Sequence, residues 1–398
     1  MNLLRESCVG PHALERLASW VAALGLALLS GCATAPPPPP PNLLHDELFT
    51  PVKLDIDAGD LFVMSDEMQR YSARELTTLA SYRDPRRALI DALYSDRKLR
   101  LAYDGGQTRT AAQAFASRSG NCLSLVIMTA AFAHHLGLPV SYQSVQVGDF
   151  YSRQGDLILA SGHVNLVLSR PPARALIPTA ADFSLIVDFL PQSELRGQRT
   201  SDLQEATVVA MYMNNRAAEA LGEGRLDEAY AWVSRALQVD PQFLMAANTL
   251  GVIYARSGHG AQAEEALRYV LLREPDTTSA LSNLVGLLGR AGRAAEAQAL
   301  SARLEQLLPV PPFHYFDLGR QAMAAGEPRR ALQLFMRELR VQPYQDEVQF
   351  WIAQAHWQLN EPEQAARYMR LAMENSSTQA GHARYAAKLD HLRKGSLR

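Results

Sequence analysis

One cysteine, one histidine and one aspartate supply the residue types of a nucleophilic site. Cys122 follows Gly120 and Asn121 and begins a mostly apolar run that ends at Gly137. The length of this run predicts a helix with Cys122 in its first turn and Asn121 as its N-cap. Unpaired backbone N–H groups at a helix start favour negative charge, so we expect them to increase the thiolate fraction of Cys122.

Two β-rich stretches carry the residues that would complete the chemistry. His163 lies at the start of the stretch 162–168, and Asp188 lies in the apolar stretch 185–190. A thiol can attack a carbonyl, an imidazole can activate the thiol, and a carboxylate can orient the imidazole. Taken singly, the residues also fit a buried inert thiol, a hydrogen-bonded histidine and a surface aspartate. The three together favour a catalytic triad. No Cys/His pair has ligand spacing, so no metal or cofactor is predicted.

The order Cys122, His163, Asp188 resembles that of the transglutaminase-like superfamily, which is related to papain-like cysteine proteases. The resemblance covers about residues 105–190. Animal transglutaminases carry a tryptophan before the nucleophile, and here Arg118 to Asn121 stand instead, so the chain is closer to bacterial members with a Gly-Asn-Cys-Leu-Ser block beside tetratricopeptide repeats. The resemblance implies an attack on an amide or peptide carbonyl through a thioester, with hydrolysis and acyl transfer both open. Similarity to papain-like enzymes suggests Gln113 as an oxyanion donor, and the backbone N–H of Cys122 is another.

The elements around these residues predict an α+β domain over residues 43–203. Helices are expected at 65–80, from Pro85 onward and at 110–116, with a short extended piece at 99–104. Alternating apolar residues then predict antiparallel strands at 140–147, 157–168 and 185–190. Asn165 is two residues beyond His163 on the same strand face, where it either lines the site or caps the strand edge.

A 34-residue period runs through residues 207–375. It places prolines at 241, 275, 309 and 343, alanines at 229, 263, 297, 331 and 365, and glycines at 224, 258, 292 and 326 with Asn360 in the fifth place. This resembles five tetratricopeptide repeats, which implies an all-α superhelix with a concave face. Residues 376–398 are expected to form a C-terminal capping helix.

The resemblance also predicts which side chains line the concave groove of the repeats and bind a protein or peptide partner. An alternative is that several of them are merely solvated. The predicted residues are Asn214, Asn248, Arg256, Ser282, Arg290, Phe313, Phe316 and Phe350.

The first 42 residues resemble the leader of a bacterial lipoprotein. An apolar core at 17–29 has the length of a signal-peptide h-region and ends in Leu29-Ser30-Gly31-Cys32, a lipobox-like motif. Residues 1–31 are therefore expected to be a signal peptide, with a true start near Val9 left open. Residues 32–42 are expected to be a lipidated Cys32 and a proline-rich linker. No Asp follows Cys32, so resemblance to Gram-negative lipoproteins implies a location at the outer membrane, facing the periplasm.

The net charge and the cysteine count further limit the partners and functions that the sequence allows. The 398-residue chain has a net charge of −2 and no basic run, so nothing points to nucleic acid. With Cys8 in the leader and Cys32 lipidated, Cys122 is the remaining free thiol. The main hypothesis is a lipid-anchored envelope enzyme whose repeats bind its protein or peptide substrate. The alternative is a non-catalytic scaffold lipoprotein for envelope assembly.

Overall fold

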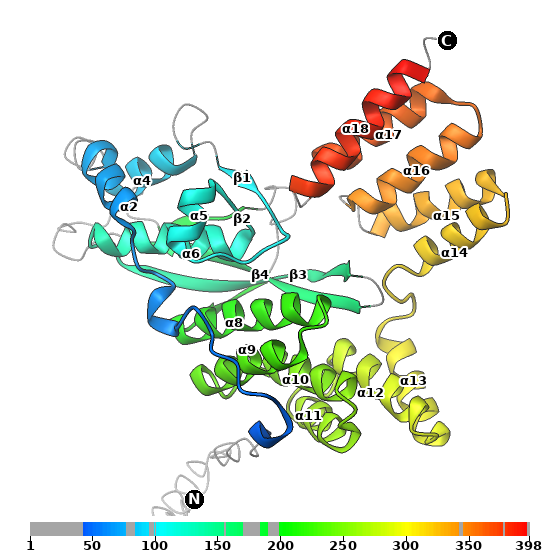
Figure 1. The fold of residues 1–398 in the computed structure, drawn as a ribbon, viewed down its shortest axis with the longest axis horizontal. Helices are drawn as coiled ribbons and strands as arrows, with labels where there is room; N and C mark the ends of the chain where they lie inside the picture. The colour runs from blue at the N-terminus through cyan, green and yellow to red at the C-terminus, as the bar shows by residue number, and fades with distance from the viewer. Residues whose placement is uncertain are drawn as a thin grey trace, which may run out of the picture. The chain divides into compact units, whose positions relative to one another are not determined.

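The computed structural model describes residues 43–76, 84–94, 99, 101–154, 157–169, 184–189, 199–341, 345–376 and 379–395 (Figure 1). The predicted signal peptide, Cys32 and the proline linker lie outside these residues. The chain divides into residues 1–42 and residues 43–398, and the second part holds all the contacts described below. No helix of the described part is long and apolar enough to cross a membrane.

Short helices precede the sheet. They are η1 (Asp46–Leu48), η2 (Ala58–Asp60), α2 (Asp66–Tyr71), η3 (Ser72–Leu76), α4 (Pro85–Tyr94), α5 (Ala111–Ser117) and α6 (Cys122–His135). Ser65 caps α2, because its hydroxyl oxygen accepts a hydrogen bond from the N–H of Met68 at 3.3 Å. The predicted helix at 65–80 is thus confirmed as far as residue 76, although its last part is a π-helical turn, and residues 77–80 lie outside the described chain.

A small antiparallel sheet follows, with the strand order β5-β4-β3-β6. Its strands are β3 (Val140–Gln154), β4 (Leu157–Leu168), β5 (Leu185–Val187) and β6 (Arg199–Leu203). β3 is longer than predicted because it pairs with β4 as far as Gln154, and β6 was not predicted. A separate parallel pair joins β1 (Ala102–Tyr103) to β2 (Ser119–Gly120). Helix α6 packs against β4 and β3, with almost its whole length buried.

Five helix pairs and a final helix make up the described residues from 205 onward (Figure 1). They are α8 (Glu205–Gly222), α9 (Leu226–Val239), α10 (Leu244–Arg256), α11 (Gly260–Arg273), α12 (Thr278–Arg290), α13 (Ala294–Leu307), α14 (His314–Ala324), α15 (Pro328–Val341), α16 (Asp346–Gln358), α17 (Pro362–Glu374) and α18 (Gln379–Gly395).

The residues of the 34-residue period separate and pack the helices, as their spacing predicted. Each residue that separates the two helices of a pair has a left-handed backbone, with φ between 60° at Asn360 and 85° at Gly258. Glycine adopts this conformation without the steric cost that a Cβ brings. At Gly319 a Cβ would lie 2.4 Å from the ring of Phe335, so only glycine lets α14 approach α15 this closely.

The buried core is interrupted within the repeats. One cluster extends from the first helices and the sheet through α12, whereas α13 has no fully buried residue. Burial resumes at Phe313, and separate clusters hold α14 to α16 and α16 to α18. Residues 313–395 therefore have cores of their own.

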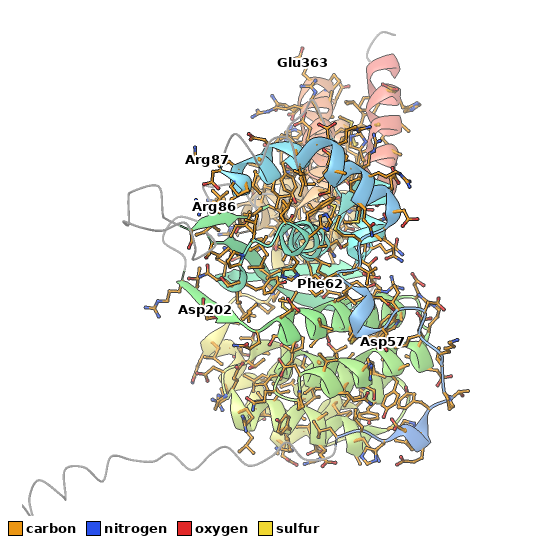
Figure 2. The ribbon with its side chains drawn as sticks, turned by 90° about the vertical axis from the view of Figure 1, so that its left-hand side faces the viewer. Asp57, Phe62, Arg86, Arg87, Asp202 and Glu363 are labelled. Carbon is orange, nitrogen blue, oxygen red and sulfur yellow. The ribbon has the colours of Figure 1, made fainter. Side chains whose placement is uncertain are left out.

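Residues 43–60, assigned by sequence to the first domain, pack on the first repeats. The hydroxyl of Tyr254 donates to the carbonyl of Leu43 at 2.8 Å, and the ring of Phe49 stacks on Tyr230 at 4.0 Å. Arg235 of α9 donates to the carboxylate of Asp57 at 2.6 Å, and Asp57 is labelled in Figure 2. The sequence pattern thus changes at residues 203–207, but residues from both sides of this boundary pack against one another.

Candidate functional site

Cys122 occupies the first turn of α6, and Asn121 is its N-cap, as predicted. The Asn121 Oδ1 atom accepts a hydrogen bond from the N–H of Ser124 at 2.9 Å. Cys122 is a free thiol and is partly exposed. The N–H groups of Cys122 and Leu123 have no acceptor within the helix, so they are candidate donors to a group that reacts at the sulfur.

Close packing and hydrogen bonds explain the residues that flank Cys122. A Cβ at Gly120 would lie 2.7 Å from the Cβ of Ser124. β2 can therefore lie this close to the start of α6 only with glycine at position 120. The Ser124 hydroxyl donates to Asn121 Oδ1 at 2.7 Å and accepts the N–H of Arg109 at 2.8 Å. The Gly-Asn-Cys-Leu-Ser block is therefore a packed and hydrogen-bonded helix start.

A polar loop before α5 supports this helix start, and few sequence signals point to it. Thr108, 1% exposed, accepts a hydrogen bond from Asn121 Nδ2 at 2.9 Å. Arg109 pairs with Asp104 at 2.8 Å, and the N–H of Asp104 donates to the carbonyl of Gly120 at 3.0 Å. Asp104 and Arg109 are opposite charges flanking a Gly-Gly turn, which was the available signal; nothing in the sequence marked Thr108.

His163 and Asp188 meet through the sheet. His163 lies in β4 opposite Val145 of β3, and Asp188 follows directly after β5, where Val187 pairs with Leu166. The His163 Nε2 atom lies 2.7 Å from Asp188 Oδ1, and both side chains are less than a tenth exposed. Since Nε2 faces the carboxylate, Nδ1 is the nitrogen available to Cys122.

The electrostatics of His163 reflect both neighbours. Burial alone lowers the pKa of the imidazole, but hydrogen bonds to Asp188 and Cys122, with their charges, outweigh burial and raise it to about 9. His163 is therefore a cation at neutral pH.

The two accessory residues considered from sequence have different outcomes. Asn165 is buried beside the aspartate, with Nδ2 3.4 Å from Asp188 Oδ2, and its Oδ1 atom has no partner among the described residues. It thus faces the site, the first of its two predicted alternatives. Gln113 is exposed and caps its own helix, since its Oε1 accepts the N–H of Thr110 at 3.1 Å. This contact engages the Oε1 atom of Gln113 at the start of α5, and its role as an oxyanion donor stays a prediction.

The predicted groove residues are scattered. Phe313 and Phe316 are buried in the core of α14 to α16, Asn214 is buried, and Phe350 packs on Tyr385 of α18. Asn248 is half-buried and accepts a hydrogen bond from Asn283 at 3.1 Å. Ser282, Arg256 and Arg290 are exposed. Apolar side chains gain more from burial than from lining an open face, which corrects the prediction for Phe313 and Phe316, whereas Phe350 is half-buried and stays a prediction.

A hollow of about 640 Å³ lies on α14 and α16, the first helices of the last two pairs. The guanidinium of Arg320 stands 5.5 Å from the ring centroid of Trp351 there. Arg320 is four residues after Phe316, a helical spacing that could have indicated it. The lining residues are Asp317, Arg320, Gln321, Met323, Ala324, Trp351 and Gln358. In the part of the chain that is described, no three His, Cys, Asp or Glu side chains could hold a metal ion.

Comparison with solved structures finds chains similar to less than half of this one. They include a MamA protein (20% identity, 45% of this chain and 96% of that chain, TM-score 0.25), PilF of Pseudomonas aeruginosa (22%, 49% and 96%, 0.27) and a thermophilic TPR protein of Thermus thermophilus (19%, 45% and 98%, 0.29). No curated protein matches the sequence. Family models match residues 220–288 and 346–378, and with the 34-residue period they identify these segments as tetratricopeptide repeats.

Proposed function

We propose that this chain is a scaffold that binds a protein or peptide through its tetratricopeptide repeats. The repeats themselves support this, because stacked helix pairs present extended surfaces to protein partners. The hollow beside Arg320 and Trp351 supplies a cation and an aromatic face, which are common anchors at protein interfaces.

A peptide library screened against the protein tests this role. The peptides it selects should lose binding to Trp351→Ala and keep it for Trp357→Ala, whose exposed tryptophan lies outside the hollow. Equal binding by both variants would show that the partner binds elsewhere on the repeats.

We further propose that Cys122, His163 and Asp188 form a nucleophilic site acting on an amide or peptide carbonyl. The observation that carries this proposal is the buried His163–Asp188 contact of 2.7 Å, together with the influence of Cys122, which helps to raise the pKa of the same histidine. A structural thiol needs no buried cation–carboxylate pair beside it, and burying such a pair costs free energy.

The proposed reaction has two steps. The Cys122 sulfur attacks the carbonyl carbon, and the N–H groups of Cys122 and Leu123 are the candidate donors to the developing oxyanion. The C–N bond breaks as His163 passes its proton to the leaving amine, and a thioester remains. Water or a second amine then attacks the thioester while His163 takes a proton from it, which releases the acid or the new amide and restores the Cys122 thiolate beside a protonated His163.

Alkylation of Cys122 by iodoacetamide tests the chemistry. His163→Ala should slow it by about tenfold or more, since the neighbouring cation that favours the thiolate is lost. Asp188→Ala should slow it less, because the aspartate acts through the histidine. His135→Ala, at the far end of α6, serves as the control and should leave the rate unchanged. If Cys122 is inert in the folded protein, or if His163→Ala does not change its alkylation rate, the cysteine chemistry is rejected and only the scaffold role remains.

We also propose that the chain is lipid-anchored in a bacterial envelope through Cys32, on the evidence of the Leu29-Ser30-Gly31-Cys32 motif. Metabolic labelling with a palmitate analogue should mark the wild type and not Cys32→Ser. Equal labelling of both would reject the anchor.

A further inference from the structure

The first repeat contacts the loop that supports the nucleophile. Glu219 of α8 accepts the backbone N–H of Thr108 on its Oε1 atom, at 2.7 Å. The two residues are 111 positions apart in the sequence. Thr108 is 1% exposed, so water does not replace this acceptor readily.

From Thr108 a continuous set of buried hydrogen bonds reaches the helix of the nucleophile. Thr108 Oγ1 accepts from Asn121 Nδ2 at 2.9 Å, and Asn121 Oδ1 accepts from both the N–H and the hydroxyl of Ser124. Cys122 lies between Asn121 and Ser124 in the sequence. The position of its backbone is thus set by contacts that end on the repeat helix.

Glu219 is itself held in place by the first repeat. Arg216 donates to Glu219 Oε2 at 3.1 Å, and the Arg216 guanidinium stands 5.5 Å from the ring centroid of Trp232 on α9. One carboxylate therefore joins α8 and α9 to the loop at residues 105–110.

We propose that Glu219 is a positioning residue for the cysteine site, so that the first tetratricopeptide repeat is part of that site and not only a partner-binding module. The inference rests on the proposed cysteine chemistry. Glu219 touches no reacting atom and acts by fixing Thr108, and through it the orientation of Cys122 toward His163.

Three variants separate positioning from general stability. Glu219→Ala removes the acceptor, whereas Glu219→Gln keeps an Oε1 acceptor and changes the charge. Glu338→Ala is the control, since Glu338 is a carboxylate that likewise accepts backbone N–H groups, those of Tyr315 and Phe316 at 3.1 and 3.2 Å, and it is buried more completely than Glu219. That residue belongs to α15, whose phenylalanine packs in a different core cluster.

Two measurements read the effect in the full chain. Amide hydrogen exchange over residues 105–124 should be about tenfold faster in Glu219→Ala, because a buried N–H loses its acceptor. The rate at which iodoacetamide alkylates Cys122 is measured in each background with and without His163→Ala. The ratio of the two rates gives the dependence of the thiol on its histidine. That dependence should fall at least about threefold in Glu219→Ala. Both readouts should stay near wild type in Glu219→Gln and Glu338→Ala.

The outcomes distinguish this inference from the function it rests on. Unchanged exchange over residues 105–124 in Glu219→Ala, or faster exchange with an undiminished dependence on His163, overturns the positioning role while the cysteine chemistry stands. An equal loss in Glu338→Ala also overturns it, because the effect would then be general. A wild-type Cys122 that does not respond to His163→Ala rejects the cysteine chemistry and the positioning role together.

Discussion

At the residue scale, the pKa of His163 depends on two partners acting against burial. Asp188→Asn removes the carboxylate charge, so the pKa should fall from about 9 toward or below the ordinary 6.5. NMR titration of the His163 ring protons measures this directly. A midpoint that stays near 9 in the variant would show that Asp188 does not hold the proton on the ring.

The same pKa shift makes the stability of the protein depend on pH. Since the folded pKa lies above the unfolded value of 6.5, the contribution of His163 is complete below pH 6.5 and is lost as pH rises through about 9. It amounts to no more than about 3 kcal/mol. Urea unfolding at pH 6 and pH 10 should show a larger loss in wild type than in Asp188→Asn. Parallel losses would assign the pH dependence to other groups.

Gly120 offers a steric test of the site. Gly120→Ala places a Cβ against Ser124, which is too short to swing away, so the helix start must shift. We expect a loss of about 1–3 kcal/mol in unfolding free energy and slower alkylation of Cys122. Gly59→Ala, where no atom lies within 4 Å of the added Cβ, is the control. If both variants behave alike, the close approach of β2 to α6 has no importance.

The residues that could be predicted from sequence are those with local signals or a recognisable order. Asn121 precedes an apolar helix, and Cys122, His163 and Asp188 fall at element boundaries or in strands. Thr108 and Glu219 could not be predicted, because their roles arise from contacts across 13 and 111 positions that no local pattern encodes.

At the scale of elements, prediction succeeded where a physical period was strong. The left-handed breaks between paired helices follow from glycine and asparagine at a fixed spacing. β6 was missed because Arg199 to Leu203 show no apolar alternation, as expected of an edge strand that is mostly exposed. β3 was predicted too short because the apolar alternation of the sequence stops near residue 147, whereas the backbone pairs with β4 as far as Gln154.

Two glycines two residues apart test the break between α10 and α11. Gly258 has φ +85°, so Gly258→Ala should cost about 1–2 kcal/mol through the left-handed backbone. Gly260 begins α11 with open space around it, so Gly260→Ala should be neutral or stabilise by up to about 1 kcal/mol. Urea unfolding of both variants measures the contrast. Equal effects would mean that helix propensity, and not backbone conformation, governs this turn.

At the scale of the whole molecule, the sequence period placed a boundary where the packing has none. The period begins near residue 207, and nothing in residues 43–60 signals that they pack on α9 and α10. Their contacts are side-chain pairs such as Tyr230 with Asp46, at 2.8 Å, which only the folded chain brings together. The interruption at α13 was likewise hidden, since α13 keeps the repeat spacing while burying no residue completely.

Fragments test this division of the molecule. In residues 207–398, Tyr230 and Tyr254 lose the segment that covers them, whereas the clusters of α14 to α18 stay intact. Circular dichroism should therefore show two melting transitions for 207–398, the first well below the corresponding one of 43–398 and the second unchanged. Residues 43–312, which keep the large cluster whole, should melt as that cluster does in 43–398. If 207–398 instead melted in one transition at the temperature of the longer chain, the repeats would fold without the first domain, and the shared core would contribute little to their stability.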